Sequence, residues 1–253
     1  GHFHSINNGI SRIGWQQGGK SAQWIDEEMS DLFLQQAQQF VIKNKARLFF
    51  LFYTLHQPHV PRVPNERFVG KSGLGPRGDA ILEADWAIGA FLKTLEKHNL
   101  ADNTLVIFSS DNGAVLDDGY NDQSVSKLGQ HQPSGILRGG KYSLFDGGAH
   151  IPLMVRWPAK IKPGVSDAFI SQHDFLASFA RLTGQSIEPS DSLDVLDAIL
   201  GQSNIGRKSL VVQALGGRTA YREENWLFIP AYWGDEKLAK ENIETGACSC
   251  YQL

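Results

Sequence analysis

One apolar run of the chain ends in an acid, an amide and a glycine, Asp111-Asn112-Gly113. The run before them, residues 104–110, is rich in apolar and β-branched residues and predicts a buried strand. Ligands of open α/β sheets bind where strands present their carboxyl ends, and a carboxylate beside a side-chain amide offers two hard oxygens to a divalent cation. We therefore expect a metal-binding strand tip here. The alternative is an Asx turn, which Asn-Gly favours.

A second group that could do chemistry is an ammonium carried on glycines, in Arg138-Gly139-Gly140-Lys141. An ammonium in this position can pair with an oxygen of an anionic ester and stabilise the charge that develops on a leaving oxygen. The alternative is a solvated lysine on a turn. We assign no role to the neighbouring His131, Arg138, Asp146 and His150, because loop structure explains them equally well.

Two histidines follow the apolar run 48–53, in the segment Leu55-His56-Gln57-Pro58-His59-Val60-Pro61. A histidine titrates near neutrality, so His59 is suited to donate a proton; the alternative is a histidine that is hydrogen-bonded within a proline-rich strand exit. His56 either lines a substrate pocket or packs beneath the loop. The prolines restrict the backbone on either side of His59.

These three segments together, in their order along the chain, resemble the sulfatase family, and most closely its bacterial arylsulfatase-A-type enzymes. The resemblance extends from residues 9–14 to residues 221–226. It implies that Asp111 and Asn112 form half of a Ca2+ site, the aspartate supplying charge and the asparagine a neutral oxygen. It also implies that His59 contacts sulfate and donates a proton to the departing alcohol, and that Lys141 pairs with a sulfate oxygen. The resemblance assigns a substrate contact to His56 less firmly than to His59.

Two features of the family pattern have no match in this sequence. Family members carry a cysteine, less often a serine, in a C-x-P-x-R motif that is oxidised to formylglycine, and a pair of aspartates that complete the calcium site. The only cysteines are Cys248 and Cys250, in a C-x-C with no proline or arginine in register. We therefore expect a fragment of a longer protein, inactive alone, that lacks the N-terminal nucleophile segment and the extreme C-terminus. The resemblance also implies a periplasmic or secreted location.

The resemblance implies a sulfuric ester hydrolase that acts on a sulfated carbohydrate or an aryl sulfate. Two alternatives remain open: a non-catalytic sulfatase-fold protein that binds glycans, and a phosphoryl-transfer relative within the alkaline phosphatase superfamily. The His-Gln-Pro-His-Val-Pro and Gly-Gly-Lys segments favour the sulfatase. Trp15, Trp24 and Trp233 could stack on sugar rings, although tryptophan is more often a core or rim residue.

The elements that must position these residues alternate between strand and helix patterns. Apolar spacing predicts helices that begin near Asp26 and Ile81, strands at 48–53, 104–110 and 153–157, and a short helix after Asp174. Strand, helix and strand in succession favour a right-handed parallel crossover. The fold class is therefore α/β, an alkaline-phosphatase-like, mostly parallel sheet flanked by helices. The segment of residues 113–140 is too long for an ordinary connection between elements, and its length predicts a functional loop.

Beyond residue 200 the pattern changes to short antiparallel strands at 209–213, 220–222 and 226–229. We expect a partial sulfatase α/β domain over residues 1–205 and the beginning of a C-terminal subdomain over residues 206–253. A chain of 253 residues that is 42% hydrophobic can build a substantial core. Its formal net charge of -3 gives little support for nucleic-acid binding. The longest apolar run, residues 48–55, is too short to cross a bilayer.

Overall fold

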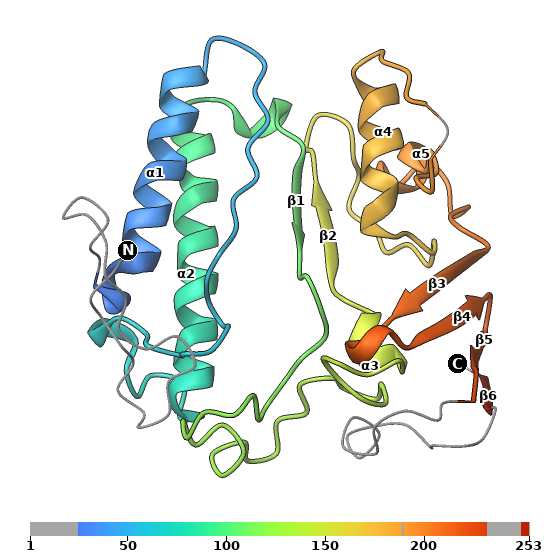
Figure 1. Cartoon of the computed structure of the whole chain (residues 1–253). Helices are drawn as coiled ribbons and strands as arrows, with labels where there is room; N and C mark the ends of the chain where they lie inside the picture. The colour runs from blue at the N-terminus through green and yellow to red at the C-terminus, as the bar shows by residue number, and fades with distance from the viewer. Residues whose placement is uncertain (1–24, 189, 232–248, 253) are drawn as a thin grey trace. The chain divides into compact units, whose positions relative to one another are not determined.

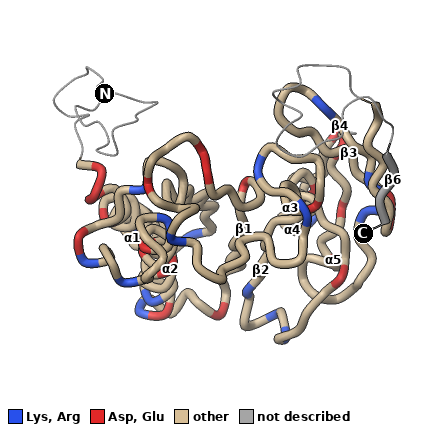
Figure 2. The backbone as a smooth tube through the Cα atoms, turned by 90° about the horizontal axis from the view of Figure 1, so that it is seen from below, with Lys and Arg blue, Asp and Glu red and all other residues tan. Residues whose placement is uncertain are grey.

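The computed structural model describes residues 25–188, 190–231 and 249–252, the last four by their backbone only (Figure 1). It divides into two compact units, which are described separately. The first contains the chain up to Ala101 together with Val115–Gln132, and the second contains Asp102–Ala114 together with Pro133–Leu253. Figure 2 shows acidic and basic residues interspersed along both units. The predicted features at residues 9–14, Trp15, Trp24, Trp233 and Cys248 lie outside the described residues.

Two long helices lie side by side in the first unit: α1 (Met29–Asn44) and α2 (Gly75–Lys97) (Figure 1). A short 3-10 turn, Asp26–Glu28, leads into α1, and its N-cap is Ile25 without a side-chain cap. The helical segment therefore begins at Asp26, as predicted, but its first turn is a 3-10 turn. The buried face of α1 includes Leu34, Ala37 and Val41. The buried face of α2 is made largely of small and polar residues, among them Ala80, Glu83, Ala87 and Thr94.

Between the two helices, the chain around residues 48–55 is extended but is not part of a regular strand. One face of this segment packs on the helices, where the ring of Phe49 lies 6.0 Å from that of Phe40 and the ring of Tyr53 lies 5.7 Å from that of Phe91. The other face is open: Leu48, Phe50 and Phe52 are 98%, 73% and 80% exposed.

The predicted strand 48–53, covered on both faces, is therefore not seen in the described part of the chain. The parallel crossover that depended on it is not seen either. The physical reason is that an apolar run has the composition of a strand wherever it lies, but it becomes one only when a neighbour pairs with its backbone.

The second unit contains a two-stranded antiparallel pair, β1 (Val106–Ser109) and β2 (Leu153–Arg156), in which Val106 is opposite Arg156. Both strands were predicted. A 3-10 turn, Gln172–Asp174, leads into α4 (Phe175–Leu182), and α5 (Leu196–Ile199) packs against α4. Side chains of α4, α5 and the β1–β2 pair share two small cores with buried members Trp157, Val195, Leu196, Ala198, Ile199 and Leu200.

Four antiparallel strands form a separate sheet near the C-terminus, in the order β3 (Ser209–Gln213), β4 (Thr219–Glu223), β5 (Trp226–Ile229) and β6 (Ser249–Gln252) (Figure 1). The antiparallel sheet expected from the sequence is confirmed for its first three strands, and β6 was not predicted. Further short 3-10 turns lie at Glu66–Phe68, Ala101–Asn103 and Leu215–Gly217. None of the described helices is both long enough and apolar enough to span a membrane.

Candidate active site

The tip of β1 carries the residues predicted to bind a metal ion. The Asp111 side chain is exposed and has no hydrogen-bond partner among the described residues. The Asn112 amide donates from Nδ2 to the Gly113 carbonyl at 2.9 Å, and its Oδ1 accepts no hydrogen bond from the described chain. Ser110 Oγ donates to the Asn112 carbonyl at 3.0 Å and so closes a local turn. The tip thus presents one carboxylate and one neutral amide oxygen.

This tip lies directly against the glycine loop that carries Lys141. The Gly113 N–H donates to the Gly148 carbonyl at 2.8 Å, and the Lys141 N–H donates to the Ala114 carbonyl at 2.9 Å. A Cβ atom on Gly113 would lie only 1.7 Å from the Gly147 carbonyl oxygen. Glycine is therefore required here by close backbone approach. The backbone of the Asp111-Asn112-Gly113 tip is thus in direct contact with the loop that carries Lys141.

The lysine loop is anchored in turn by the C-terminal sheet. Leu144 and Phe145, which follow Lys141, are 2% and 3% exposed and pack with Ala220, Leu227 and Ile229 of β4 and β5. Next in the chain comes α3 (Asp146–Ala149), and Arg222 of β4 pairs with Asp146 at 2.9 Å.

A second arginine binds the same loop, since Arg218 donates to the Tyr142 carbonyl at 3.3 Å. The C-terminal sheet and the residue before β4 thus hold the backbone that follows the lysine. The Lys141 Nζ itself lies 5.1 Å from the centre of the Tyr142 ring. Asp146 accordingly has a structural role in this loop, a role that sequence reasoning did not assign.

The two histidines lie in the first unit, on a turn closed by the His59 N–H, which donates to the His56 carbonyl at 3.1 Å. The peptide bonds before Pro58 and Pro61 are both cis. His59 is exposed, and its Nδ1 lies within hydrogen-bond distance of the Val60 carbonyl.

Buried polar side chains fasten this turn to the rest of the unit. Gln57 is 5% exposed and donates to Glu83 of α2 at 2.9 Å. Arg62 donates from Nε to the Pro58 carbonyl at 3.1 Å and from Nη1 to Asp122 at 2.6 Å. It also binds the carbonyls of residues 115 and 116. One guanidinium therefore joins the histidine turn to the beginning of the long loop that follows β1.

His56 is packed against α1, with its ring edge-on to Phe33 at a centroid distance of 5.9 Å. Burial lowers the pKa of His56 from 6.5 to about 4, and the nearby Asp26 carboxylate opposes this shift only in part. The ring is consequently neutral at neutral pH. These contacts match the packing alternative for His56. Burial likewise raises the pKa of Glu83, against the hydrogen bonds from Asn65, Gln57 and Ser30.

Sequence reasoning missed the residues that hold the site: Gln57, Arg62, Glu83, Arg218 and Arg222. A signal existed for one of them. Glu83 shares a helical spacing with Ala80, Ala87 and Thr94, and an acid within a stripe of small residues indicates a buried polar partner. The others are ordinary polar residues whose partners lie far away in sequence.

The candidate metal site is incomplete within the described residues, where no three histidine, cysteine, aspartate or glutamate side chains gather. Calcium takes about six to eight oxygen ligands, and a carboxylate with a neutral carbonyl is a suitable part of such a set. The available oxygens of Asp111 and Asn112 fit calcium as two ligands of several.

The chain belongs to the sulfatase family, since the family model "Sulfatase" matches residues 4–185. It is 46% identical over 251 residues to the N-acetylgalactosamine-6-O-sulfatase of Bacteroides thetaiotaomicron, covering 95% of this chain and 49% of that protein. It is 35% identical over 171 residues to human Arylsulfatase A, covering 66% of this chain and 32% of the relative. The chain thus spans about half the length of the first relative and about a third of the second.

Solved structures give the same classification. A structure from work on the metabolism of multiple glycosaminoglycans by Bacteroides thetaiotaomicron is 44% identical, with a TM-score of 0.91, covering 98% of this chain and 53% of that one. The PsFucS1 sulfatase from a Pseudoalteromonas species shares the fold, with a TM-score of 0.73 at 21% identity. The predicted family and the predicted alkaline-phosphatase-like fold class are therefore confirmed, although every strand pair within the described residues is antiparallel.

Proposed function

We propose that the gene product containing this chain hydrolyses sulfate monoesters of a carbohydrate. The observation that supports the proposal is the backbone contact between the Asp111-Asn112 tip and the Lys141 loop. In the proposed active site, this contact lets two hard oxygens and an ammonium act on the same ester. A sulfate ester needs this combination, because its charge must be neutralised while the leaving oxygen gains negative charge. Family membership supports the same reaction.

Each residue has a defined role in this proposal. Asp111 and Asn112 would hold calcium, which when bound would neutralise charge on the sulfate oxygens. Lys141 pairs with the sulfate and stabilises the bridging oxygen as its bond to sulfur breaks. His59 holds the proton that the departing alcohol requires. The formylglycine nucleophile of the family has no matching motif in this chain and would come from other residues of the gene product.

The name of one relative supports a proposal for the substrate class. A curated relative is named for 6-O-sulfated N-acetylgalactosamine, and we assign that sugar as the first substrate to test, with an aryl sulfate as the less specific comparison. We also place the activity in the periplasm or outside the cell, where large sulfated glycans are met. Cell fractionation with an antibody to the gene product tests this location.

The decisive experiment measures sulfate release from 6-O-sulfated N-acetylgalactosamine by the complete gene product and by its Lys141→Ala variant. We expect a loss of roughly 100- to 1000-fold in turnover, the usual effect of removing one group that stabilises developing charge. The melting temperature should change little, because Lys141 lies on a glycine loop. The matched control is Lys97→Ala at the exposed end of α2. A large fall in the melting temperature of Lys141→Ala, sufficient to explain its loss of turnover by unfolding, would count against the assigned role.

The same assay separates the alternatives. Binding of sulfated glycan without release of sulfate would identify a non-catalytic glycan-binding protein. Faster release of phosphate from the matching phosphomonoester would identify a phosphoryl-transfer enzyme. Either result would overturn the proposal.

A further inference from the structure

One exposed side chain of the second unit reaches the end of β1 from a distant part of the chain. The Nε2 of Gln172 donates to Ser109 Oγ at 3.1 Å and to the Ser110 carbonyl at 2.9 Å. Ser109 Oγ in turn donates to the Pro152 carbonyl at 2.8 Å, just before β2. A single carboxamide thus joins the last residue of β1 to the residue directly before Asp111.

Gln172 is itself held by a rigid turn. The turn is a capping box, in which Ser171 Oγ accepts from the His173 N–H and the Asp174 carboxylate accepts from the Ser171 N–H at 3.0 Å. Asp174 is fully buried. A capping box fixes the backbone at both of its ends, so the position of Gln172 is set by its own turn.

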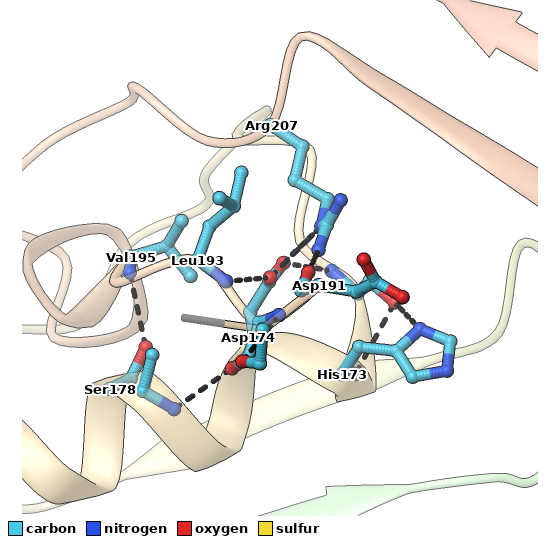
Figure 3. Close-up of polar contacts among 11 residues, drawn as sticks. His173, Asp174, Ser178, Asp191, Leu193, Val195 and Arg207 are labelled. Atoms are coloured by element: carbon cyan, nitrogen blue, oxygen red, sulfur yellow. Dashed lines mark hydrogen bonds and ion pairs between the residues drawn. The ribbon is translucent and has the colours of Figure 1, made fainter. Parts of the chain in front are cut away.

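The turn is locked from behind by a loop of the same unit (Figure 3). Arg207 Nε contacts both oxygens of Asp174, at 2.9 and 2.8 Å, and the Leu193 N–H donates to one of them at 2.9 Å. On the first turns of α4, Ser178 Oγ accepts from the Val195 N–H at 3.1 Å. These bonds explain why a side chain at the surface can occupy a fixed position.

The β1 tip needs such support. The ladder between β1 and β2 ends at Ser109 opposite Leu153, and the next backbone bond to the rest of the unit is that of Gly113 to Gly148. Between these two points the Ser110 carbonyl accepts from Gln172 Nε2 at 2.9 Å and, at the longer distance of 3.5 Å, from Oγ of the adjacent Ser109. Of these two bonds, only the one from Gln172 ties the carbonyl to a distant part of the chain. Without Gln172, the peptide that leads into Asp111 would be held only by local bonds of Ser109 and Ser110, and we expect it to open more readily.

We propose that Gln172 is a positioning residue, which orients the β1 tip so that Asp111 and Asn112 direct their oxygens at one metal ion. The inference rests on the proposed function, in which these two residues hold calcium. Groups that orient metal ligands without touching the metal are commonly worth about 10- to 100-fold in metal affinity.

The test uses Gln172→Glu, which keeps the size of the side chain but replaces the donating N–H groups by an acceptor facing the Ser110 carbonyl. The matched control is Gln185→Glu, at an exposed position past the end of α4. In the 253-residue chain, we expect faster deuterium uptake at residues 108–114 in Gln172→Glu and unchanged uptake in Gln185→Glu. Unchanged uptake in both variants would overturn the proposal.

Calcium titration of the complete gene product by calorimetry supplies the second measurement. Gln172→Glu should weaken calcium binding about tenfold, and Gln185→Glu should leave it unaltered. Faster uptake with unaltered calcium affinity would show a merely structural contact and would also overturn the proposal. If the unsubstituted gene product binds no calcium, the proposed function fails, whereas the deuterium uptake still decides whether Gln172 holds the tip.

Discussion

At the scale of single residues, Gly113 is the position where the tip of β1 and the lysine loop touch. Because a Cβ on Gly113 would lie 1.7 Å from the Gly147 carbonyl oxygen, Gly113→Ala must push the two segments apart. We expect turnover to fall sharply and the protein to lose about 1–3 kcal/mol of stability, as for other overpacked sites. Gly164→Ala is the control, because nothing lies within 4 Å of its added Cβ. Turnover and thermal melting of both variants check this prediction.

The pH dependence of stability can be traced to His56. Its pKa is lowered from 6.5 to about 4 in the folded chain, so its stabilising contribution is complete above pH 6.5 and is lost as the pH falls through about 4. Each unit of difference corresponds to about 1.4 kcal/mol. We expect His56→Phe, which keeps an aromatic ring against Phe33, to flatten the fall in melting temperature between pH 6.5 and pH 4. His131→Phe, at an exposed site, should retain the original slope.

At the scale of elements, the C-terminal sheet acts as the support of the lysine loop. Arg222 of β4 and Asp146 are 21% and 14% exposed at the side chain, so loss of the arginine leaves a largely buried carboxylate with only the 3.8 Å contact to the exposed His150. We expect Arg222→Met to lower stability by about 1–3 kcal/mol and to reduce turnover through displacement of Lys141. Removal of an exposed ion pair is worth less than about 1 kcal/mol. Arg181→Gln, whose partners are 40% and 55% exposed, is the comparison in urea unfolding.

Elements were predictable from sequence where local pattern decides them. The strands at 106–109 and 209–213 and most of the helix α2 follow from apolar spacing and turn residues, although α2 begins at Gly75, before the predicted start near Ile81. The prediction of a strand at residues 48–53 was wrong, because a strand also requires a partner strand, which no local pattern encodes.

The candidate site divides in the same way. The residues that could do chemistry stand out by type and motif, and the backbone contact between the Asp111 tip and the Lys141 loop agrees with the expected proximity. The convergence of their side chains on one ion stays a prediction. The buried bonds of Gln57 to Glu83 and of Arg62 to Asp122 were not, because their partners are 26 and 60 residues apart. The placement of His59 relative to Lys141 stays a prediction.

At the scale of the whole molecule, calcium binding should depend on more than the residues described. Asp111 and Asn112 provide two oxygens, and calcium requires about six to eight. We therefore expect the 253-residue chain to bind calcium weakly and the complete gene product to bind it more tightly. Calorimetric titration of both proteins checks this, and tight binding by the 253-residue chain would contradict it.

The open face of the extended segment has a consequence for handling the protein. Leu48, Phe50 and Phe52 are 98%, 73% and 80% exposed, and the backbone between them belongs to no ladder. Such an edge is a template for pairing with another chain. Preparations of the 253-residue chain should therefore self-associate as concentration rises, and light scattering should detect fewer oligomers after Phe50→Lys. Because these three apolar side chains are exposed, we expect the protein to be best stored at low concentration with a mild detergent.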